Sequence, residues 1–328
     1  MILNKINIEN FKKINNLELS LANINILVGT NGAGKSSVLQ ALHLACCTIR
    51  QANEVRSDKT STIDIQNLDY LPTDDYKLLG HNCKWGNNNA SPCSKISLEF
   101  KDNDQIISAN CTLRSARNAG ISITGLIPTQ LSNLLRNKRQ YFSAYIPGIS
   151  GIPNKEEKKS KKVILKSSSF GDSNVILRNI LLLLKELNSS NITKIEKWLK
   201  PLIGTIHFDV SHDDEADLFI KCDFSFTDAN GSVTDKKPIE LLGSGYLQLL
   251  QIFCYVLLFK PKLLLIDEPD IHLHPTIQEN LIHSLSKIND DTEDGFSMKI
   301  ILTTHSPFII RGATEECNIF WIENGTAQ

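Results

Sequence analysis

The stretch GTNGAGKS, residues 29–36, matches the pattern G-x-x-x-x-G-K-[ST]. The apolar segment 16–29 leads into it and the segment 35–47, which has helical spacing, follows it. The stretch is therefore predicted to join a strand to a helix, the context that this pattern requires. Its glycines let the backbone wrap closely, so that successive N–H groups and the helix dipole face a phosphate. We therefore interpret residues 29–36 as a phosphate-binding loop, the P-loop.

Two side chains of the P-loop carry the chemistry expected of a nucleotide site. Lys35 is expected to neutralise the β- and γ-phosphates, and the hydroxyl of Ser36 is expected to ligate Mg²⁺. The residues predicted to contact the nucleotide here are Asn31, Gly32, Ala33, Gly34, Lys35, Ser36 and Ser37.

The last third of the chain alternates between helical and strand patterns. Helices are predicted at 245–259 and 276–288, and strands at 262–267, 299–305 and 318–325. Such alternation is typical of parallel strands joined by crossover helices, so we predict an α/β core.

Two of these predicted strands deliver ionisable side chains at their carboxyl ends. LLLIDEPD (263–270) places Asp267 to hold Mg²⁺, and Glu268 beside it to polarise an attacking water as a general base. KIILTTHSP (299–307) delivers His305 to the same edge, where ligands of open parallel sheets bind and where it is expected to sense the γ-phosphate. Read alone, either motif is also typical of an ordinary strand end. The upstream P-loop favours the functional interpretation.

The signature segment LLGSGYLQLLQ (241–251) contains a second small glycine turn that opens a helix, and a helix start is an anion site. Since the P-loop already holds one nucleotide, we predict that Ser244 and Gly245 contact the nucleotide of another copy in a twofold, head-to-tail dimer. The alternative is a glycine N-cap on a core helix.

The region between the motifs is less regular. Residues 51–93 are polar and are expected to form a long surface excursion. KISLEF (95–100) and QIISANCTL (105–113) predict an antiparallel hairpin with its turn at DND.

We expect two head lobes, about 1–124 and 206–328, separated by a helical and basic insertion at 125–205. The insertion has room for a short helical arm at 174–200. Its basic segment 155–166 is an expected contact for DNA, RNA or an acidic partner, or else a solvated loop; the absence of aromatic residues there favours the loop.

Composition sets limits on the rest. With 328 residues, 41% hydrophobic residues and a net charge of −1, the chain is predicted to be globular, without a global attraction to nucleic acid or membranes. The eight cysteines form no disulfide scaffold pattern, and the longest aliphatic stretch, 180–184, is too short to cross a bilayer. No signal-peptide pattern opens the chain. We expect a cytoplasmic protein with no membrane partner.

Four segments in this order resemble the ABC-type ATPase heads, in particular the SMC, RecF and OLD-like branch. They are IENFKKINNLELSL before the P-loop, the signature segment, LLLIDEPDIHLHP as Walker B, and LTTHSP as switch. The form E-P-x-x-x-L-H-P resembles the stand-alone AAA/ABC ATPases of bacterial phage defence, such as the OLD, Septu and PARIS ATPase subunits. The resemblance implies a P-loop NTPase fold with a mixed sheet, an antiparallel β-subdomain and a short helical insertion.

For individual residues, the resemblance implies ATP and Mg²⁺ as ligands. It assigns Lys35, Glu268 and His305 to catalysis, Ser36 and Asp267 to the metal, and Ser244 and Gly245 to contacts in trans. The sequence departs from the family where Gly243 stands in place of the usual signature serine. The glutamine that usually assists Mg²⁺ binding in this family has no motif match in this sequence, and Gln66 is the candidate for it.

The resemblance further implies an ATP-sandwiched homodimer that controls a separate effector, a nuclease or toxin, in antiviral defence. Because the chain ends at NGTAQ without a nuclease domain, the effector is expected on another chain, unless this chain is a truncated one. The alternatives are a DNA-clamping ATPase of DNA repair or maintenance, and a scaffold that holds ATP without turnover.

Overall fold

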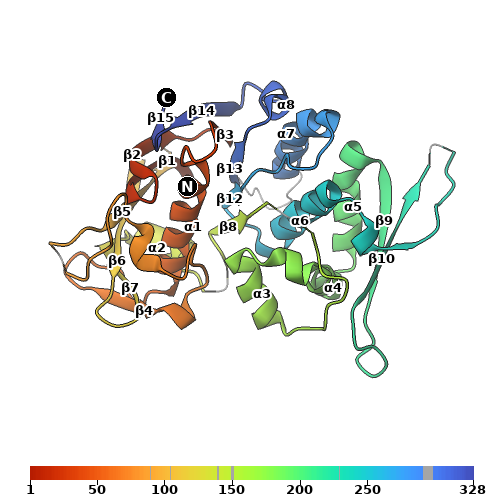
Figure 1. Cartoon of the computed structure of the whole chain (residues 1–328), viewed down its shortest axis with the longest axis horizontal. Helices are drawn as coiled ribbons and strands as arrows, with labels where there is room; N and C mark the ends of the chain where they lie inside the picture. The colour runs from red at the N-terminus through yellow and green to blue at the C-terminus, as the bar shows by residue number, and fades with distance from the viewer. Residues whose placement is uncertain (89, 104, 139, 149–150, 229, 291–297) are drawn as a thin grey trace.

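The computed structural model of the chain describes residues 1–328 except 89, 104, 139, 149–150, 229 and 291–297. Figure 1 shows the antiparallel sheet at one end of the molecule, the central strands in the middle, and a group of helices toward the other end. The strands are β1 Ile2–Phe11, β2 Ile14–Ser20, β3 Ile24–Val28, β4 Ser61–Asp64, β5 Ser94–Asp102, β6 Gln105–Ser115, β7 Gly120–Leu126, β8 Ser143–Ile146, β9 Thr205–Ser211, β10 Lys221–Thr227, β11 Lys237–Pro238, β12 Leu263–Ile266, β13 Lys299–Thr304, β14 Cys317–Glu323 and β15 Thr326–Ala327. The α-helices are α1 Lys35–Gln51, α2 Thr129–Leu135, α3 Lys161–Phe170, α4 Leu177–Leu187, α5 Ser190–Ile203, α6 Ser244–Phe259, α7 Pro275–Asp290 and α8 Pro307–Arg311, and the 3-10 turns are η1 Ile65–Asn67, η2 Tyr76–Leu79, η3 Ser173–Ile176 and η4 Ile239–Leu241.

The central sheet has the order β15-β14-β3-β13-β12-β8. All its neighbouring pairs are parallel except β14 with β15, which makes the sheet mixed. The carboxyl ends of β3, β12 and β13 therefore meet at one edge. This confirms the predicted α/β core and brings the P-loop, the Walker B carboxylates and His305 to that edge.

The central sheet separates two hydrophobic cores. Leu263 and Leu265 of β12 face α1 and the antiparallel sheet, whose order is β2-β1-β5-β6-β7-β4, whereas Leu264 and Ile266 face the helices. Because both faces are covered, β12 is apolar at every position. The predicted hairpin is confirmed as β5 and β6, which pair in antiparallel register.

The predicted single strand at 16–29 is divided. Asn25 is fully buried; its side chain accepts a hydrogen bond from the Ala22 amide and donates to the carbonyls of Ala22 and Ile300. These contacts hold the turn at which β2, in the antiparallel sheet, ends and β3, in the central sheet, begins.

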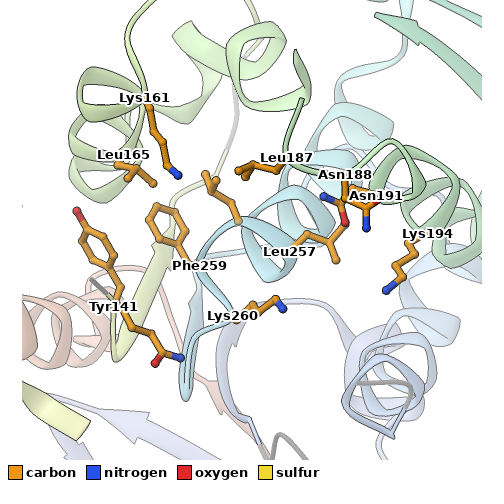
Figure 2. Close-up of a pocket in the computed structure, with 12 residues that line it drawn as sticks. Tyr141, Lys161, Leu165, Leu187, Asn188, Asn191, Lys194, Leu257, Phe259 and Lys260 are labelled. Carbon is orange, nitrogen blue, oxygen red and sulfur yellow. The ribbon is translucent and has the colours of Figure 1, made fainter. Parts of the chain in front are cut away.

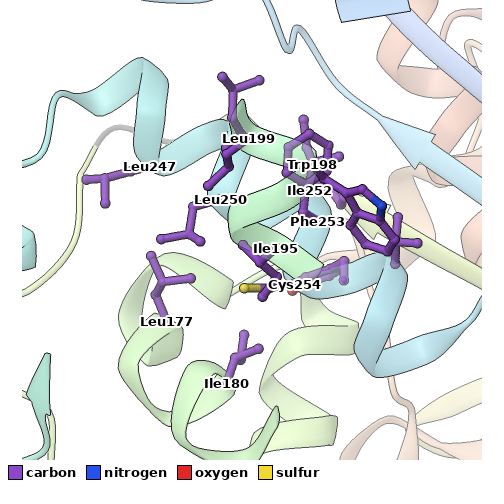
Figure 3. Packing of buried hydrophobic residues seen from close by; sticks show 14 of the residues in the cluster. Leu177, Ile180, Ile195, Trp198, Leu199, Leu247, Leu250, Ile252, Phe253 and Cys254 are labelled. Carbon is purple, nitrogen blue, oxygen red and sulfur yellow. The ribbon is translucent and has the colours of Figure 1, made fainter. Parts of the chain in front are cut away.

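The helices α4 and α5 do not form the expected arm. They pack on each other, on α6 and on β9, and α5 also contacts α7. Figure 3 shows Ile180, Ile195 and Trp198 gathered around the side chains of α6. The expected short arm is absent because Leu177–Leu184 of α4 are buried, and α4 packs on α5, α6 and β9.

Two expectations for irregular regions were also wrong. Within 51–93, β4 extends the antiparallel sheet, and Leu68, Tyr70 and Trp85 are buried in its core. Within the expected basic insertion, β8 pairs with β12 in the central sheet. The apolar residues within 51–93 and those of β8 follow neither helical nor strand periodicity in the sequence. In addition, β8 is only four residues long.

None of the helices in the described part of the chain combines the length and apolar character needed to cross a bilayer.

Candidate nucleotide-binding site

The P-loop forms a tight turn between the end of β3 at Val28 and the start of α1 at Lys35. Gly34 has a φ of +112°, a conformation that side chains with a Cβ rarely adopt. A Cβ on Gly29 would lie 2.2 Å from the carbonyl oxygen of Ile322, because β14 passes directly beside the loop. Both glycines are therefore required by the backbone path.

A small cavity of about 130 Å³ lies over this loop. Its lining residues are Lys13, Asn31, Gly32, Gly34, Lys35, Ser36, Ser37 and Glu268. All but one of the P-loop residues predicted to contact the nucleotide are thus brought to one cavity. The exception is Ala33, which is buried and whose carbonyl accepts a hydrogen bond from Gly325 N–H, so it anchors the loop to the β14–β15 turn.

Lys35 is 4% exposed, and its ammonium has three close acceptors. Its Nζ lies 3.0 Å from the Gly29 carbonyl, 3.3 Å from the Thr30 carbonyl and 2.7 Å from His305 Nε2. Burial lowers the pKa of Lys35, and the nearby carboxylates, Glu268 first among them, act in the opposite direction. A phosphate in the cavity would compete with these neutral acceptors for a charged donor, which favours its binding.

Asp267 is the centre of a group of hydroxyls at the end of β12. Its Oδ1 accepts from Ser36 Oγ at 2.9 Å and from Thr303 Oγ1 at 2.6 Å, and its Oδ2 accepts from Tyr145 Oη at 3.1 Å. Burial raises the pKa of the Tyr145 phenol, which therefore stays a donor. The Ser36 hydroxyl and the Asp267 carboxylate, one from each motif, thus lie in direct contact.

These two groups fit a magnesium ion in their chemistry. Mg²⁺ prefers oxygen ligands, keeps several waters and binds through one or two protein groups together with substrate phosphates. A hydroxyl and a carboxylate in contact beside a phosphate-sized cavity match that donor set. Ser36 and Asp267 are the residues that would hold the ion.

Glu268 lines the cavity and has an unusual backbone. Its φ of +47° lies in the left-handed region, which costs a non-glycine residue about 1–2 kcal/mol. Its N–H donates to Thr303 Oγ1 at 2.9 Å, which holds this conformation. Its Oε1 lies 3.1 Å from His305 Nε2. Strain of this kind is often found at functional sites, and here it turns a carboxylate toward the phosphate loop.

The end of β13 is attached to the loop after β12. Thr304 Oγ1 donates to Asp270 Oδ1 at 2.6 Å, and Gln278 of α7 donates to the carbonyls of Asp270 and Leu273. Burial raises the pKa of Asp270, although the hydrogen bond from Thr304 lowers it in part. His305 therefore sits on a braced segment while its own ring remains partly exposed.

The signature residues are not part of this cavity. Ser244 is the first residue of α6, and Gly243 before it is exposed, with open space around the position of a Cβ. Gly245 is buried, and a Cβ there would lie 2.5 Å from the carbonyl oxygen of His272. Gly245 thus packs against the loop that follows β12, while Gly243 is exposed and Ser244 is partly exposed.

Sequence reasoning missed several residues near the site. Lys13 lines the cavity, and Lys12 donates to Gln40 Oε1 of α1 at 2.7 Å. Burial lowers the pKa of Lys12, and the Asp267 carboxylate raises it in part. The two lysines follow β1 directly. The only signal for them was a charged pair in the turn between two apolar strands.

The tentative assignment of Gln66 to Mg²⁺ was wrong. Gln66 is exposed in η1, next to Asn67, whose carbonyl accepts a hydrogen bond from Gln51 at the end of α1. The 17 residues of α1 extend about 25 Å, so Gln66 lies at the far end of this helix from the P-loop.

The sequence matches the family model described as AAA ATPase domain in two overlapping stretches, residues 1–217 and 154–310. No protein with a curated description matches the chain.

Solved structures of SMC heads have the same fold. The SMC head domain from Thermotoga maritima aligns with a TM-score of 0.53 at 12% identity, over 100% of this chain and 97% of that one. An SMC head bound to the C-terminal winged-helix domain of ScpA aligns with a TM-score of 0.58 at 13% identity, over 100% of this chain and 96% of that one. An SMC head with an extended coiled coil, bound to a C-terminal domain of ScpA derived from Pyrococcus furiosus, aligns with a TM-score of 0.55 at 11% identity. This alignment covers 100% of this chain and 95% of that one. At these identities the similarity establishes the fold alone, that of an SMC head.

Proposed function

The chain belongs to the AAA ATPase domain family, and we propose that it is a Mg²⁺-dependent ATPase whose two active sites form between two copies paired head to tail. The observation that carries the proposal is the contact between Ser36 and Asp267 beside the cavity that Lys35 and Glu268 line. Each copy would contribute its P-loop to one site and its signature segment to the other.

In the proposed reaction, each residue has one task. Lys35 exchanges its carbonyl and imidazole acceptors for phosphate oxygens. Mg²⁺, held by Ser36 and Asp267, would neutralise charge on the β- and γ-phosphates. Glu268 accepts a proton from the water that attacks the γ-phosphorus, while the bond to the β–γ bridging oxygen breaks and ADP leaves. Once Lys35 has moved to the phosphates, His305 Nε2, 3.1 Å from this carboxylate, is free to donate a hydrogen bond that orients it.

The exposed start of α6 supports pairing between copies. Gly243 and Ser244 present helix N–H groups on the surface, and the chain's own phosphate cavity does not include them. A second copy would bring a γ-phosphate to these groups. Ser244 would be the contact that replaces the serine missing at 243.

We further propose that the ATP cycle opens and closes the pair to control a separate effector, a nuclease or toxin, in bacterial antiviral defence. The form of the Walker B segment, Glu268 to Pro275, supports this through its resemblance to phage-defence ATPases. The binding of ScpA domains by two SMC heads of similar fold is consistent with a head that carries a partner protein.

The SMC-head fold also favours a second candidate, an ATPase that clamps DNA. This candidate predicts DNA binding that strengthens with ATP and weakens steeply with salt, since phosphate contacts release counterions. A flat response of DNA binding to both ATP and salt contradicts it.

The proposed activity is tested by measuring phosphate release from ATP with freshly purified protein and Mg²⁺. Lys35→Ala serves as the blank, because removal of the ammonium should reduce both nucleotide binding and turnover to background. Turnover in the parental protein no greater than in the Lys35→Ala protein would mean that the chain holds ATP only as a scaffold.

A further inference from the structure

A pocket of about 650 Å³ opens at the C-terminal end of α6 (Figure 2). Its walls come from the start of α3, the junction of α4 and α5, the last residues of α6, and Gln140 and Tyr141 ahead of β8. The 16 residues of α6 extend about 24 Å, so the pocket lies far from Ser244 at the start of that helix. The pocket shares no lining residue with the nucleotide cavity, so a ligand could bind there whether or not the chain is an ATPase.

The pocket is strongly basic. Lys161, Lys194 and Lys260 line it, and the part of the chain that the structure describes contributes no aspartate or glutamate to its lining. No ion pair to these three lysines occurs within the described residues. Figure 2 shows Lys161 reaching toward Phe259 from α3, Lys260 below Phe259 and Leu257, and Lys194 on the far side of Leu257. Three ammonium groups with no acidic partner among the described residues make the pocket complementary to an acidic ligand.

Lys260 is placed there by an unfavourable backbone conformation. It ends α6 with φ +42° and ψ +55°, a left-handed position that glycine normally fills at the end of a helix. A residue with a Cβ is less stable than glycine in this conformation. The conformation directs the chain, and with it this side chain, to the rim of the pocket.

The apolar surface of the pocket is aliphatic. Leu187 is 53% exposed, and Leu165, Leu257 and Leu258 are half-buried. They form a surface wide enough for a branched aliphatic side chain beside the lysines.

The aromatic rings of the pocket are already packed on each other. Phe259 is buried between the edges of Tyr141 and Tyr255, with ring centroids 4.9 and 5.2 Å apart. The guanidinium of Arg50 covers the Tyr141 ring at 3.7 Å from its centroid. With these contacts, the rings offer no stacking platform for a nucleobase, which disfavours nucleic acid as the occupant.

We propose that this pocket is the docking site for an acidic segment of a partner protein. Carboxylates of the segment pair with Lys161, Lys194 and Lys260, and a leucine-like side chain packs on the exposed leucines. Since the pocket and the signature segment are at opposite ends of α6, the partner binds there whether or not two copies are paired.

The test measures fluorescence anisotropy with the labelled peptide EDLEELLD and the full chain. We expect saturable binding that weakens at least about tenfold in Lys194→Glu/Lys260→Glu, through lost charge pairs and new repulsion. The matched control is Lys84→Glu/Lys101→Glu, which changes the same charge at exposed lysines elsewhere and should leave binding unchanged. Leu187→Ser, at an exposed position, should weaken binding about threefold or more.

Specificity is tested with two further probes. The peptide EDSEESSD keeps the charge without leucines and should bind at least about tenfold more weakly. Lys35→Ala should bind EDLEELLD as the parental protein does, which separates this inference from the proposed ATPase. The inference is overturned by an absence of saturable peptide binding, by equal loss in the control variant, or by a single-stranded oligonucleotide that competes for the pocket more strongly than the peptide.

Discussion

The two glycine-led helix starts of this chain, at α1 and at α6, have very different surroundings. The start of α1 has a complete set of partners within the chain: Lys35 in its first turn, Asp267 against Ser36, and Glu268 across the cavity. The start of α6 has Gly243 exposed and Ser244 partly exposed. Both are anion sites in principle. Only the first has the groups that turn an anion site into a reaction site.

The difference indicates that the two helix starts have different roles. The start of α1 has the groups proposed to hold the nucleotide and to carry the chemistry, whereas the start of α6 offers, among the described residues, only helix N–H donors and one hydroxyl. Such a half-site is useful only if a second molecule supplies the rest. Substitutions at the two helix starts can test whether they have these different roles.

The largest effect is expected from Glu268→Gln, at the complete site. The amide keeps the shape and the cavity wall but accepts a proton poorly, so ATP turnover should fall at least about 100-fold while ATP binding persists. The measurement is phosphate release beside equilibrium binding of ATP, with size-exclusion chromatography to detect a trapped pair. Turnover at the parental rate would remove Glu268 from the role of base.

At the start of α6, the two signature glycines should respond differently. Gly245→Ala places a Cβ 2.5 Å from the His272 carbonyl oxygen and should lower the free energy of unfolding by about 1–3 kcal/mol. Gly243→Ala meets open space at an ordinary φ of −56°, and should change it by less than about 0.5 kcal/mol. Denaturant unfolding of both variants checks this, and equal effects would contradict the packing assigned to Gly245.

Acid should destabilise the fold through a buried histidine of α1. His43 of α1 is fully buried, accepts from Ser143 Oγ and donates to the Ser169 carbonyl, and burial lowers its pKa to about 4. In the unfolded chain it takes up a proton near pH 6.5, so stability falls as pH drops from 7 through this range toward 4.

The expected loss between pH 7 and pH 5 is about 2 kcal/mol from this residue. Denaturant unfolding at the two pH values measures it, and His43→Gln should reduce the pH dependence whatever its effect on stability at pH 7. An unchanged pH dependence in His43→Gln would show that another group is responsible.

Much of the fold was predictable because its decisive signals are local. The P-loop and the strands β12 and β13 are short apolar runs with chemistry at their ends, and parallel pairing brings those ends together without further information. The contact between Ser36 and Asp267 follows from that topology.

The remaining features depend on tertiary contacts that no local pattern encodes. β8 is a four-residue strand only because β12 pairs with it, and Tyr145 on it reaches Asp267. Trp85 is buried by a segment whose composition is that of a loop. Lys13 reaches the cavity because the β1–β2 turn passes beside Gly34, a contact between elements that the sequence does not reveal.

The central claim, that the two helix starts complete each other across two copies, is tested most directly by mixing two inactive variants. Lys35→Ala disables the P-loop of one chain, and Ser244→Glu, at a partly exposed position, places a negative charge where the partner's phosphate should lie. In mixed pairs, one site has both defects and the other has none. Each variant alone should be inactive, and an equimolar mixture should recover about a quarter of the parental ATP turnover. A mixture as inactive as its components, or full turnover by Ser244→Glu alone, would contradict the account.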